Sequence, residues 1–445
     1  MKINNYTLLV GIILLITSCS VQKSMVLPYQ NISNELKVSP VNQQHQVGFI
    51  LKEIGSTKSM VEQEADHYFT PASNTKLYTF YTALNMLGDS IPTFKYVVKN
   101  DSLIIWPMAD ASFLHPDFKN QPAFDFLKNS NKTIYLVTGR YSGEKFGPGW
   151  SWGDYNDYYQ TEITELPIYG NAINITATAK GEIKYSPDVA SLYLSEIEVS
   201  PAAKKVVRDL GSNNLSVPKR VSANYQQIVP LHLSKGIIEN LLTDTLLATG
   251  MVTKPLRNLE WRSIPANAKT FYSIASDTLY QHMLQPSDNF MAEEILLNCA
   301  AAKNLSMNTD SVIAYSKKNY LNDLPDKIAW ADGSGLSRYN LFTPRDMAAL
   351  LQKIYDKVGN EKRLFNLLPN GGKSGTIRNM FKTGESPFVF AKSGSLANNY
   401  CLSGYLIGKS GKKYIFSFMN NSFVSPTSEI RAEVERVLTF IHDNY

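Results

Sequence analysis

A serine and a lysine that could act together stand three residues apart in the stretch Phe69–Lys76, as Ser73 and Lys76. The apolar residues that follow recur at helical spacing, at Leu77, Phe80, Leu84 and Leu87. Ser73 and Lys76 are therefore predicted to share one face of the first turn of a helix. A serine hydroxyl beside an amine can lose its proton to that amine, which gives a nucleophile without any histidine.

This spacing alone is not specific, because the chain repeats it elsewhere. The other instances are Ser20 and Lys23, Ser142 and Lys145, Ser216 and Lys219, and Ser410 and Lys413. Two later motifs single out Ser73, namely Ser287-Asp288-Asn289 and Lys392-Ser393-Gly394. Each of these tripeptides is common in turns, caps or loops, but here the three motifs follow in order at predicted helix or strand boundaries. The ordered set S-x-x-K, S-D-N and K-T-G is typical of β-lactamases and penicillin-binding proteins.

The three motifs supply the parts of an acyl transfer. Ser73 attacks an amide carbonyl, and Lys76 accepts the proton of the Ser73 hydroxyl. For this, burial or a nearby cation must lower the pKa of Lys76, so that the lysine has lost its own extra proton. Ser287 and Asn289 bridge the proton path to the leaving nitrogen. A lysine on a strand edge draws in the substrate carboxylate, and Gly394 lets substrate backbone lie against the strand. This chemistry requires no metal and no organic cofactor, and the six histidines show no metal-ligand spacing.

Two other motifs compete for these roles. Lys382-Thr383-Gly384 is identical to the motif K-T-G, but turn residues follow it. A strand-hairpin pattern follows Lys392 instead. Strand context therefore favours Lys392. Gly371-Gly372-Lys373-Ser374 is similar to the end of a phosphate-binding loop, but Leu367 occupies the position of the required earlier glycine. We expect neither motif to form the site.

The sequence around the motifs resembles the D-alanyl-D-alanine carboxypeptidase/endopeptidase family of low-molecular-mass class C penicillin-binding proteins (penicillin-binding protein 4 type, peptidase family S13). The similar segments are Gln285–Asn289 with Ala292-Glu293, Asp332–Arg338 with Thr343-Pro344-Arg345, and Gly375–Arg378. The long interval between Ser73 and Ser287 is also similar, because that family carries a large insertion there. Ser393 and Ser395 depart from the family's usual threonines but keep the hydroxyl, so activity is expected to survive.

The resemblance implies an α+β fold of the serine β-lactamase/DD-peptidase type, an antiparallel sheet with helices on both faces. The expected domains are a discontinuous penicillin-binding domain at 45–92 and 272–445 and a mostly β inserted lobe at 93–271. The sequence patterns agree with this organisation. They predict two strands before the Ser73 helix, short β-like pieces in the insertion, and a strand hairpin and a helix at the end.

The resemblance and the chemistry together imply roles for individual residues. The catalytic residues are Ser73, Lys76, Ser287 and Asn289, and the backbone N–H groups of Ser73 and Ser395 form an oxyanion hole. The substrate-binding residues are Lys392, Ser393, Gly394, Ser395 and Arg338. For Arg338, contact with the side-chain carboxylate of diaminopimelate and a loop-stabilising role are equally open.

The expected substrates are peptidoglycan stem peptides cut at D-Ala-D-Ala, and β-lactam antibiotics are expected to acylate Ser73. Carboxypeptidase and endopeptidase action both stay open, because both cut the same kind of bond. The alternatives are a β-lactamase and a non-catalytic cell-wall-binding lipoprotein that keeps the fold; the intact motifs argue against the second. The net charge of +5 is diluted over 445 residues without a dense Lys/Arg run, so no nucleic acid partner is expected.

The N-terminus predicts export. Lys2 precedes the apolar run Leu8–Ile16, which is too short for a stable transmembrane helix and has the shape of a signal peptide. Ile16-Thr17-Ser18-Cys19 resembles a bacterial lipobox, in which cleavage precedes an acylated cysteine, here Cys19. An uncleaved anchor and plain secretion are the alternatives.

These features imply a lipoprotein signal peptide at 1–18 and a polar tether at 19–44. The expected location is the periplasm, lipid-anchored to the cell envelope at the outer membrane. Cys299 and Cys401 lie in apolar surroundings. An oxidising compartment would allow them to pair, but buried free thiols are the favoured expectation.

Overall fold

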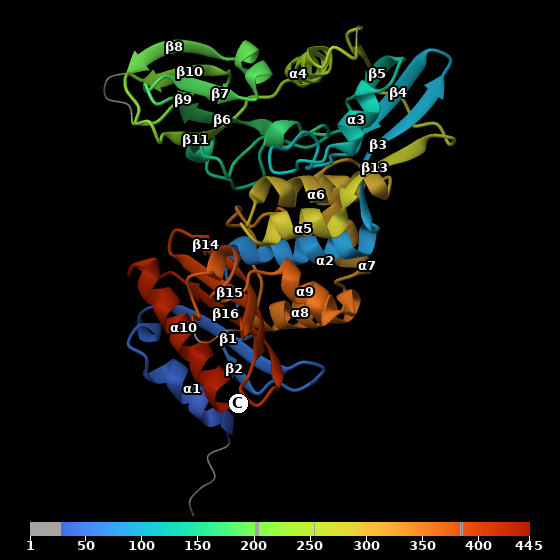
Figure 1. Cartoon of the computed structure of the whole chain (residues 1–445). Coiled ribbons are helices and arrows are strands. Elements are labelled where there is room, and N and C mark those ends of the chain that lie inside the picture. Colours follow the sequence, from blue (N-terminus) through green and yellow to red (C-terminus); the bar gives the residue numbers. More distant parts are fainter. Residues whose placement is uncertain (1–27, 201–203, 253, 383, 385) are drawn as a thin grey trace, which may run out of the picture.

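The centre of the fold is a five-stranded antiparallel sheet in the order β14-β15-β16-β1-β2 (Figure 1). The structure is a computed structural model that describes residues 28–200, 204–252, 254–382, 384 and 386–445. The strands are β1 (Gln46–Glu53), β2 (Val61–Gln63), β14 (Val389–Leu396), β15 (Asn399–Ile407) and β16 (Lys413–Asn421). The early strand β1 pairs with the late strand β16, from Gln46 opposite Asn421 to Glu53 opposite Tyr414. The two ends of the chain therefore build one sheet.

Helices cover both faces of this sheet, which explains why β15 and β16 are buried along almost their whole length. The helices α1 (Pro28–Val38) and α10 (Thr427–Asn444) pack on one face, in a cluster that includes Ile32 and Val434. The helices α2 (Lys76–Met86) and α8 (Pro344–Val358) pack on the other, through residues such as Leu77 and Leu351. The predicted fold class is confirmed.

A layer of further helices lies between the sheet and the inserted lobe (Figure 1). These are α5 (Ser276–Leu284), α6 (Asn289–Ala302) and α7 (Thr309–Asn319), with α9 (Glu361–Leu367) beside α8. The Asp288 carboxylate caps α6 by accepting from Met291 N at 2.9 Å. Every residue of α6 from Phe290 to Ala301 is buried. The polar side chains on this helix must therefore find partners inside the protein.

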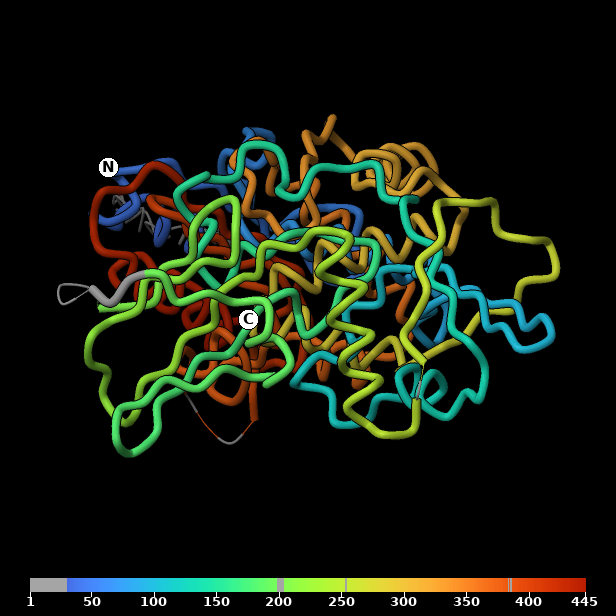
Figure 2. Tube along the Cα trace, turned by 90° about the horizontal axis from the view of Figure 1, so that it is seen from above, coloured from blue at the N-terminus to red at the C-terminus, as the bar shows by residue number. Residues whose placement is uncertain are grey.

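The inserted lobe is mostly β, and the residues that the structure describes form three sheets in it. A five-stranded mixed sheet has the order β12-β5-β4-β3-β13, and two three-stranded sheets have the orders β11-β6-β7 and β8-β10-β9. The elements are β3 (Ser90–Lys99), β4 (Ser102–Pro107), α3 (Pro122–Lys128), β5 (Thr133–Val137), β6 (Ala172–Ala177), β7 (Ile183–Ser186), β8 (Ser195–Ser200), β9 (Val207–Arg208), β10 (Asn214–Pro218), β11 (Gln226–Pro230), α4 (Lys235–Ala248), β12 (Arg257–Leu259) and β13 (Lys269–Ala275). Seen from above, this lobe extends over much of the rest of the chain (Figure 2).

Two of the predicted boundaries need correction. The insertion was expected at 93–271, but its sheet begins with β3 at Ser90 and ends with β13 at Ala275. The tether was expected at 19–44, but residues 28–38 form α1, because Ile32 and Leu36, one helical turn apart, are buried against the sheet. Cys19 and the predicted signal peptide lie outside the described residues.

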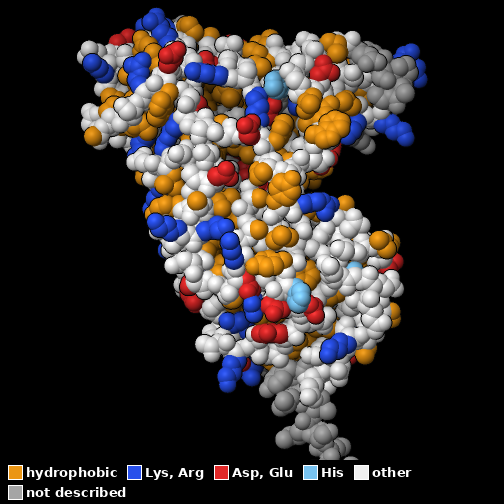
Figure 3. Space-filling model, turned by 180° about the vertical axis from the view of Figure 1, so that it is seen from behind, with side chains coloured by type: hydrophobic (Ala, Val, Ile, Leu, Met, Phe, Trp, Pro, Cys, Tyr) orange, Lys and Arg blue, Asp and Glu red, His pale blue; other side chains and the backbone are white. Residues whose placement is uncertain are grey.

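The surface is hollowed between the inserted lobe and the sheet domain, on the side where β14 lies (Figures 1 and 3).

Short 3-10 turns connect several elements, at Asn42–Gln44, Ala72–Thr75, Trp152–Asp154, Tyr169–Asn171, Asp188–Tyr193 and Gly375–Ile377. Among the helices that the structure describes, none combines the length and the apolar character needed to cross a membrane.

Candidate active site

Ser73 lies in the 3-10 turn Ala72–Thr75, which leads directly into α2 at Lys76. The sequence predicted both residues in the first turn of one helix; in the structure only Lys76 belongs to the α-helix. The two side chains still meet, because Lys76 Nζ donates to Ser73 Oγ at 2.9 Å. Ala72 has a φ of +48°, a left-handed conformation that is uncommon for alanine. Such backbone strain is concentrated at functional sites.

The Lys76 ammonium is fully buried and uses all three of its donors. Besides Ser73 Oγ, it contacts Asn289 Oδ1 at 2.6 Å and Ser334 O at 2.7 Å. Burial lowers the pKa of Lys76 to about 8, although Asp288, Asp332 and Glu293 oppose the shift. The lysine beside the serine is therefore a far better proton acceptor near neutral pH than a lysine in water.

Lys392 on β14 is buried as well, and its Nζ donates to Ser287 Oγ at 2.8 Å and to Ser393 O at 2.6 Å. Burial, and then the charge of Lys76, lower the pKa of Lys392 well below its usual value. Ser287 has a φ of +69°, which is a second strained backbone position at the site. The structure thus joins the second and third motifs directly.

Gly394 allows β14 to approach the turn that carries Ser73. A Cβ at Gly394 would lie 2.5 Å from Pro71 O and 2.9 Å from Ser73 N. The predicted role of this glycine was to admit substrate backbone, but in the structure it admits the protein's own turn that carries Ser73. Gly335 likewise allows its own loop to approach the turn that carries Ser73, because a Cβ at this position would lie 1.9 Å from Ala72 O.

The strand β14 is an edge strand of the sheet, and part of its outer edge is already paired. Ala391 N donates outward to Pro369 O at 3.0 Å. Because backbone groups alternate along an antiparallel strand, the N–H groups of Ser393 and Ser395 face the same outer side. Ser395 is exposed to solvent. These outward groups are available to a bound peptide.

Two other predicted binding residues have defined partners. Ser393 Oγ donates to Thr376 Oγ1 at 2.6 Å, which brings the exposed Thr376 to the site. Arg338 donates to Asn399 Oδ1 at 3.1 Å and to Ala397 O at 3.0 Å. In the structure this arginine therefore holds the turn between β14 and β15, in agreement with the loop-stabilising alternative.

Sequence analysis assigned no role to two buried acids beside Lys76. Glu293 accepts from Gly333 N at 2.9 Å and from Ser334 N at 2.7 Å, and so positions the carbonyl that Lys76 contacts. Burial, and then the charge of Asp332, raise the pKa of Glu293 to about 7. Glu293 and Asp332 both stand in the segments that carried the family resemblance, but Glu293 accepts from backbone groups, which no side-chain pattern reveals.

Residues 150–164 of the inserted lobe, here called the strap, also reach the site. Asn289 Nδ2 donates to Tyr159 O at 3.0 Å, and Trp150 Nε1 donates to Asp332 Oδ2 at 2.9 Å. The three motifs gave no indication of these residues. The contact with Asn289 is made by a backbone carbonyl, which every residue type carries, so it could not be predicted from the sequence.

Neither the competing Lys382 motif nor the cysteines contribute a side chain to the contacts described above. Lys382 is exposed, and Thr383 lies outside the described residues. Cys299 on α6 and Cys401 on β15 are buried free thiols, which confirms the favoured expectation. Burial raises the pKa of Cys401 to about 12, so it is a poor nucleophile. Within the described residues no group of three or more His, Cys, Asp or Glu could hold a metal ion.

Comparisons with known proteins agree on one family. A model described as the D-Ala-D-Ala carboxypeptidase 3 (S13) family matches residues 29–439. The D-alanyl-D-alanine carboxypeptidase DacB of Haemophilus influenzae is 24% identical over 439 residues, which is 88% of each chain. A penicillin-sensitive carboxypeptidase A of Dictyostelium discoideum is 21% identical over 76% of this chain and 74% of its own. The crystal structure of penicillin binding protein 4 (dacB) from Haemophilus influenzae has the same fold, with a TM-score of 0.72 and 19% identity over 93% of this chain and 99% of that one.

Proposed function

The chain belongs to the D-Ala-D-Ala carboxypeptidase 3 (S13) family, whose members are serine-type hydrolases, and we propose that it cleaves D-Ala-D-Ala bonds of peptidoglycan stem peptides through an acyl-enzyme on Ser73. One observation carries the proposal. The Lys76 amine, with its pKa lowered to about 8, lies 2.9 Å from Ser73 Oγ. A nucleophile and a base within hydrogen-bond reach are the requirement for covalent catalysis by serine.

In the first step, Lys76 in its neutral form accepts the proton of Ser73 as Ser73 Oγ attacks the carbonyl carbon. A positioned general base contributes about 10²–10⁴-fold to such a rate. Asn289 Oδ1 and Ser334 O hold the amine in place, at 2.6 and 2.7 Å. The neutral amine keeps its lone pair for the Ser73 proton.

The tetrahedral intermediate then collapses and the D-alanine amine leaves. Ser287 relays to this nitrogen the proton that Lys76 accepted from Ser73, so that Ser287 regains its hydroxyl and Lys76 returns to its neutral form. The Ser287 hydroxyl is held in the hydrogen-bonded network, 2.8 Å from Lys392 Nζ. The Lys392 charge also binds the terminal carboxylate, with Ser393. An incoming anion would favour the ammonium form of Lys392, which burial otherwise disfavours.

Substrate backbone pairs with the outer edge of β14, where Ser393 and Ser395 present their N–H groups. Addition of a strand to an exposed sheet edge is a general mode of peptide binding. The N–H groups of Ser73 and Ser395 donate to the developing oxyanion, and loss of one such donor costs about 2.7–4 kcal/mol. Water releases the acyl group. A β-lactam enters the same first step, but its leaving nitrogen stays tethered to the acyl group.

The decisive experiment is labelling with a fluorescent penicillin. The parent protein should form a covalent adduct on Ser73, and Ser73→Ala should form none. An unlabelled parent, or equal labelling of both proteins, would contradict the proposal. The rate of adduct loss separates a peptidase from a β-lactamase, because a β-lactamase releases the adduct rapidly.

Carboxypeptidase and endopeptidase action are both compatible with this site. Digestion of purified peptidoglycan distinguishes them, since the first releases free D-alanine and the second splits cross-linked stem peptides. Both products would identify a dual activity, and neither product from a protein that binds penicillin would contradict the proposed substrate.

We also propose that Cys19 is acylated and holds the protein to the cell envelope from the periplasmic side, at the outer membrane. The lipobox-like Ile16–Cys19 and the preceding apolar run support this. Labelling cells with a palmitate analogue should mark the parent and spare Cys19→Ala, which should leave the membrane fraction. An unmarked parent, or an unchanged distribution of the variant, would contradict the anchor.

A further inference from the structure

The amide of Asn289 has a fixed orientation because its two ends have different partners. Its Oδ1 accepts from Lys76 at 2.6 Å, and its Nδ2 donates to Tyr159 O at 3.0 Å. A backbone carbonyl can only accept, so it selects the NH₂ end and leaves Oδ1 for the lysine. If the Tyr159 carbonyl moved away, the amide could turn its NH₂ end toward an ammonium that cannot accept a hydrogen bond.

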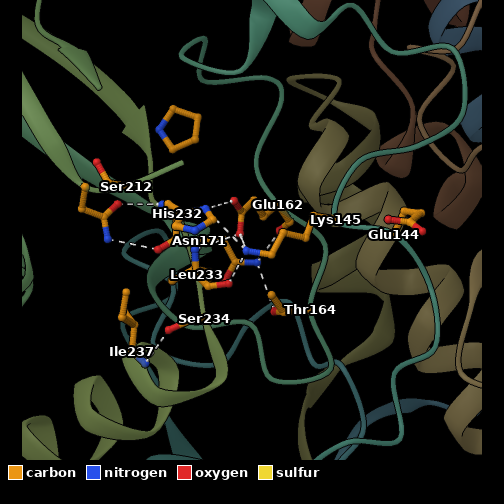
Figure 4. Close-up of polar contacts among 12 residues, drawn as sticks. Glu144, Lys145, Glu162, Thr164, Asn171, Ser212, His232, Leu233, Ser234 and Ile237 are labelled. Atoms are coloured by element: carbon orange, nitrogen blue, oxygen red, sulfur yellow. Dashed lines mark hydrogen bonds and ion pairs between the residues drawn. The ribbon is translucent and has the colours of Figure 1, made fainter. Parts of the chain in front are cut away.

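Glu162 anchors the strap a few residues beyond Tyr159. Its side chain is only 1% exposed, and its Oε1 lies 2.8 Å from His232 Nδ1. Its Oε2 accepts from Lys145 Nζ at 2.9 Å and from Leu233 N at 2.8 Å (Figure 4). A carboxylate is tolerated at such burial only with partners of this kind. Glu162 therefore ties the strap to two other segments of the inserted lobe.

The backbone around Glu162 is held as well. Asn171 Nδ2 donates to Glu162 O at 2.8 Å (Figure 4). Ile163 N donates to Lys145 O at 2.9 Å. Ile163 packs in an apolar cluster with Leu297 of α6. The polar contacts thus hold the strap within the inserted lobe, and the apolar contact packs it against the helix whose first residue is Asn289.

We propose that Glu162 is a positioning residue for acylation of Ser73: through the strap, it holds the Tyr159 carbonyl against Asn289 and so keeps Asn289 Oδ1 on Lys76. The proposal rests on the proposed function of Ser73. It gives the inserted lobe a part in the chemical step, although the lobe contributes no side chain to the three motifs.

The test compares full-length Glu162→Ala with the parent. We expect its second-order rate constant for penicillin acylation to fall by about 10²-fold, since a misplacement of about 1 Å can cost that much. We also expect the midpoint of its pH–rate profile to move to lower pH, because an ammonium that has lost the Asn289 acceptor gives up its proton more easily. A purely structural role would lower the amount of folded protein and leave this midpoint in place.

Two comparisons isolate the pathway. In an Asn289→Ala background, Glu162→Ala should have no further effect on acylation, because the residue it positions is gone. Asp110→Asn is the matched control, since Asp110 is a buried carboxylate of the same lobe whose partners are Thr93, Ser112 and Ser273. It should lower the melting temperature without changing the acylation rate of the folded protein.

Acylation of Glu162→Ala at the parent's rate and pH midpoint would overturn the proposal, as would equal losses in the parent and Asn289→Ala backgrounds. If Glu162→Ala does not fold, Lys145→Met tests the same anchor, because that lysine is 42% exposed and only one partner of Glu162 is removed. A smaller loss with the same acidic shift is expected, and no change would count against the anchor. A parent that penicillin does not label would instead refute the proposed function.

Discussion

Two buried lysines face the reaction from different regions, Lys76 at the start of α2 and Lys392 on the edge strand β14. Both are buried, and burial lowers the pKa of each. Three carboxylates act on Lys76 and raise its pKa back toward the normal range, to about 8. The charge that acts on Lys392 is that of Lys76, which lowers its pKa further.

The difference shows how one residue type can serve two purposes within a single site. Lys76 exchanges a proton near neutral pH, as a base requires. Lys392 is an unfavourable cation until an anion arrives, as a carboxylate-binding group requires. The surrounding acids, rather than the lysines themselves, decide which group is the base.

The strongest test of this comparison is to remove the base. Lys76→Arg keeps a positive charge that cannot be lost in proteins, so acylation should fall by about 10²–10⁴-fold. Stopped-flow measurement with a chromogenic β-lactam gives the rate. If the variant acylates at the parent's rate, Lys76 is not the base, and Lys392 takes that role instead.

A second test increases the separation between β14 and the turn that carries Ser73. Gly394→Ala would place a Cβ 2.5 Å from Pro71 O, so β14 or this turn must shift. We expect an acylation loss of about 10²-fold with the fold retained, because a small misplacement of the reacting groups is enough. Circular dichroism controls for folding, and Gly211→Ala, at an exposed turn with no atom near the added Cβ and without a positive φ, is a control for alanine substitution.

Removal of the second lysine should have a smaller effect. Lys392→Met deletes one charge-assisted hydrogen bond to the substrate carboxylate, worth about 1.5–3 kcal/mol, and should lower kcat/KM by about 10- to 100-fold. Steady-state hydrolysis of a D-Ala-D-Ala peptide measures this loss. The exposed Lys382 is the matched control, and a larger loss from Lys382→Met would mean that the wrong motif had been chosen.

The smallest effect should come from the acids that distinguish the two lysines. Acylation should increase as pH rises through about 8, where Lys76 loses its proton. Glu293→Gln removes a negative charge that favours the ammonium, so the midpoint should move down, by less than about one unit, because Glu293 itself has a pKa of about 7. A pH–rate profile measures the shift, and the surface variant Asp125→Asn should leave it unchanged. An upward shift would contradict the assignment.

Local periodicity predicted individual strands and helices, and the family resemblance carried by the ordered motifs implied the sheet, the helices on its two faces and the inserted lobe. The same motifs indicated Ser73, Lys76, Ser287 and Lys392 before any geometry was known. The contacts of Glu293 with Gly333 N and Ser334 N, and of Asn289 with Tyr159 O, were not predictable. Backbone groups are the partners there, and every residue type carries them.

The helix α1 was missed for a related reason. Its polar composition suggested a tether, and only contacts with distant parts of the chain, among them β2 and α10, show that Ile32 and Leu36 belong to the core. This helix would limit the distance between the active site and the proposed anchor at Cys19. For a chain attached to a membrane at Cys19, the segment up to Pro28 can extend at most about 30 Å. The catalytic domain would then reach only the layer of cell wall nearest that membrane, and more distant peptidoglycan would have to move into this range to be cleaved.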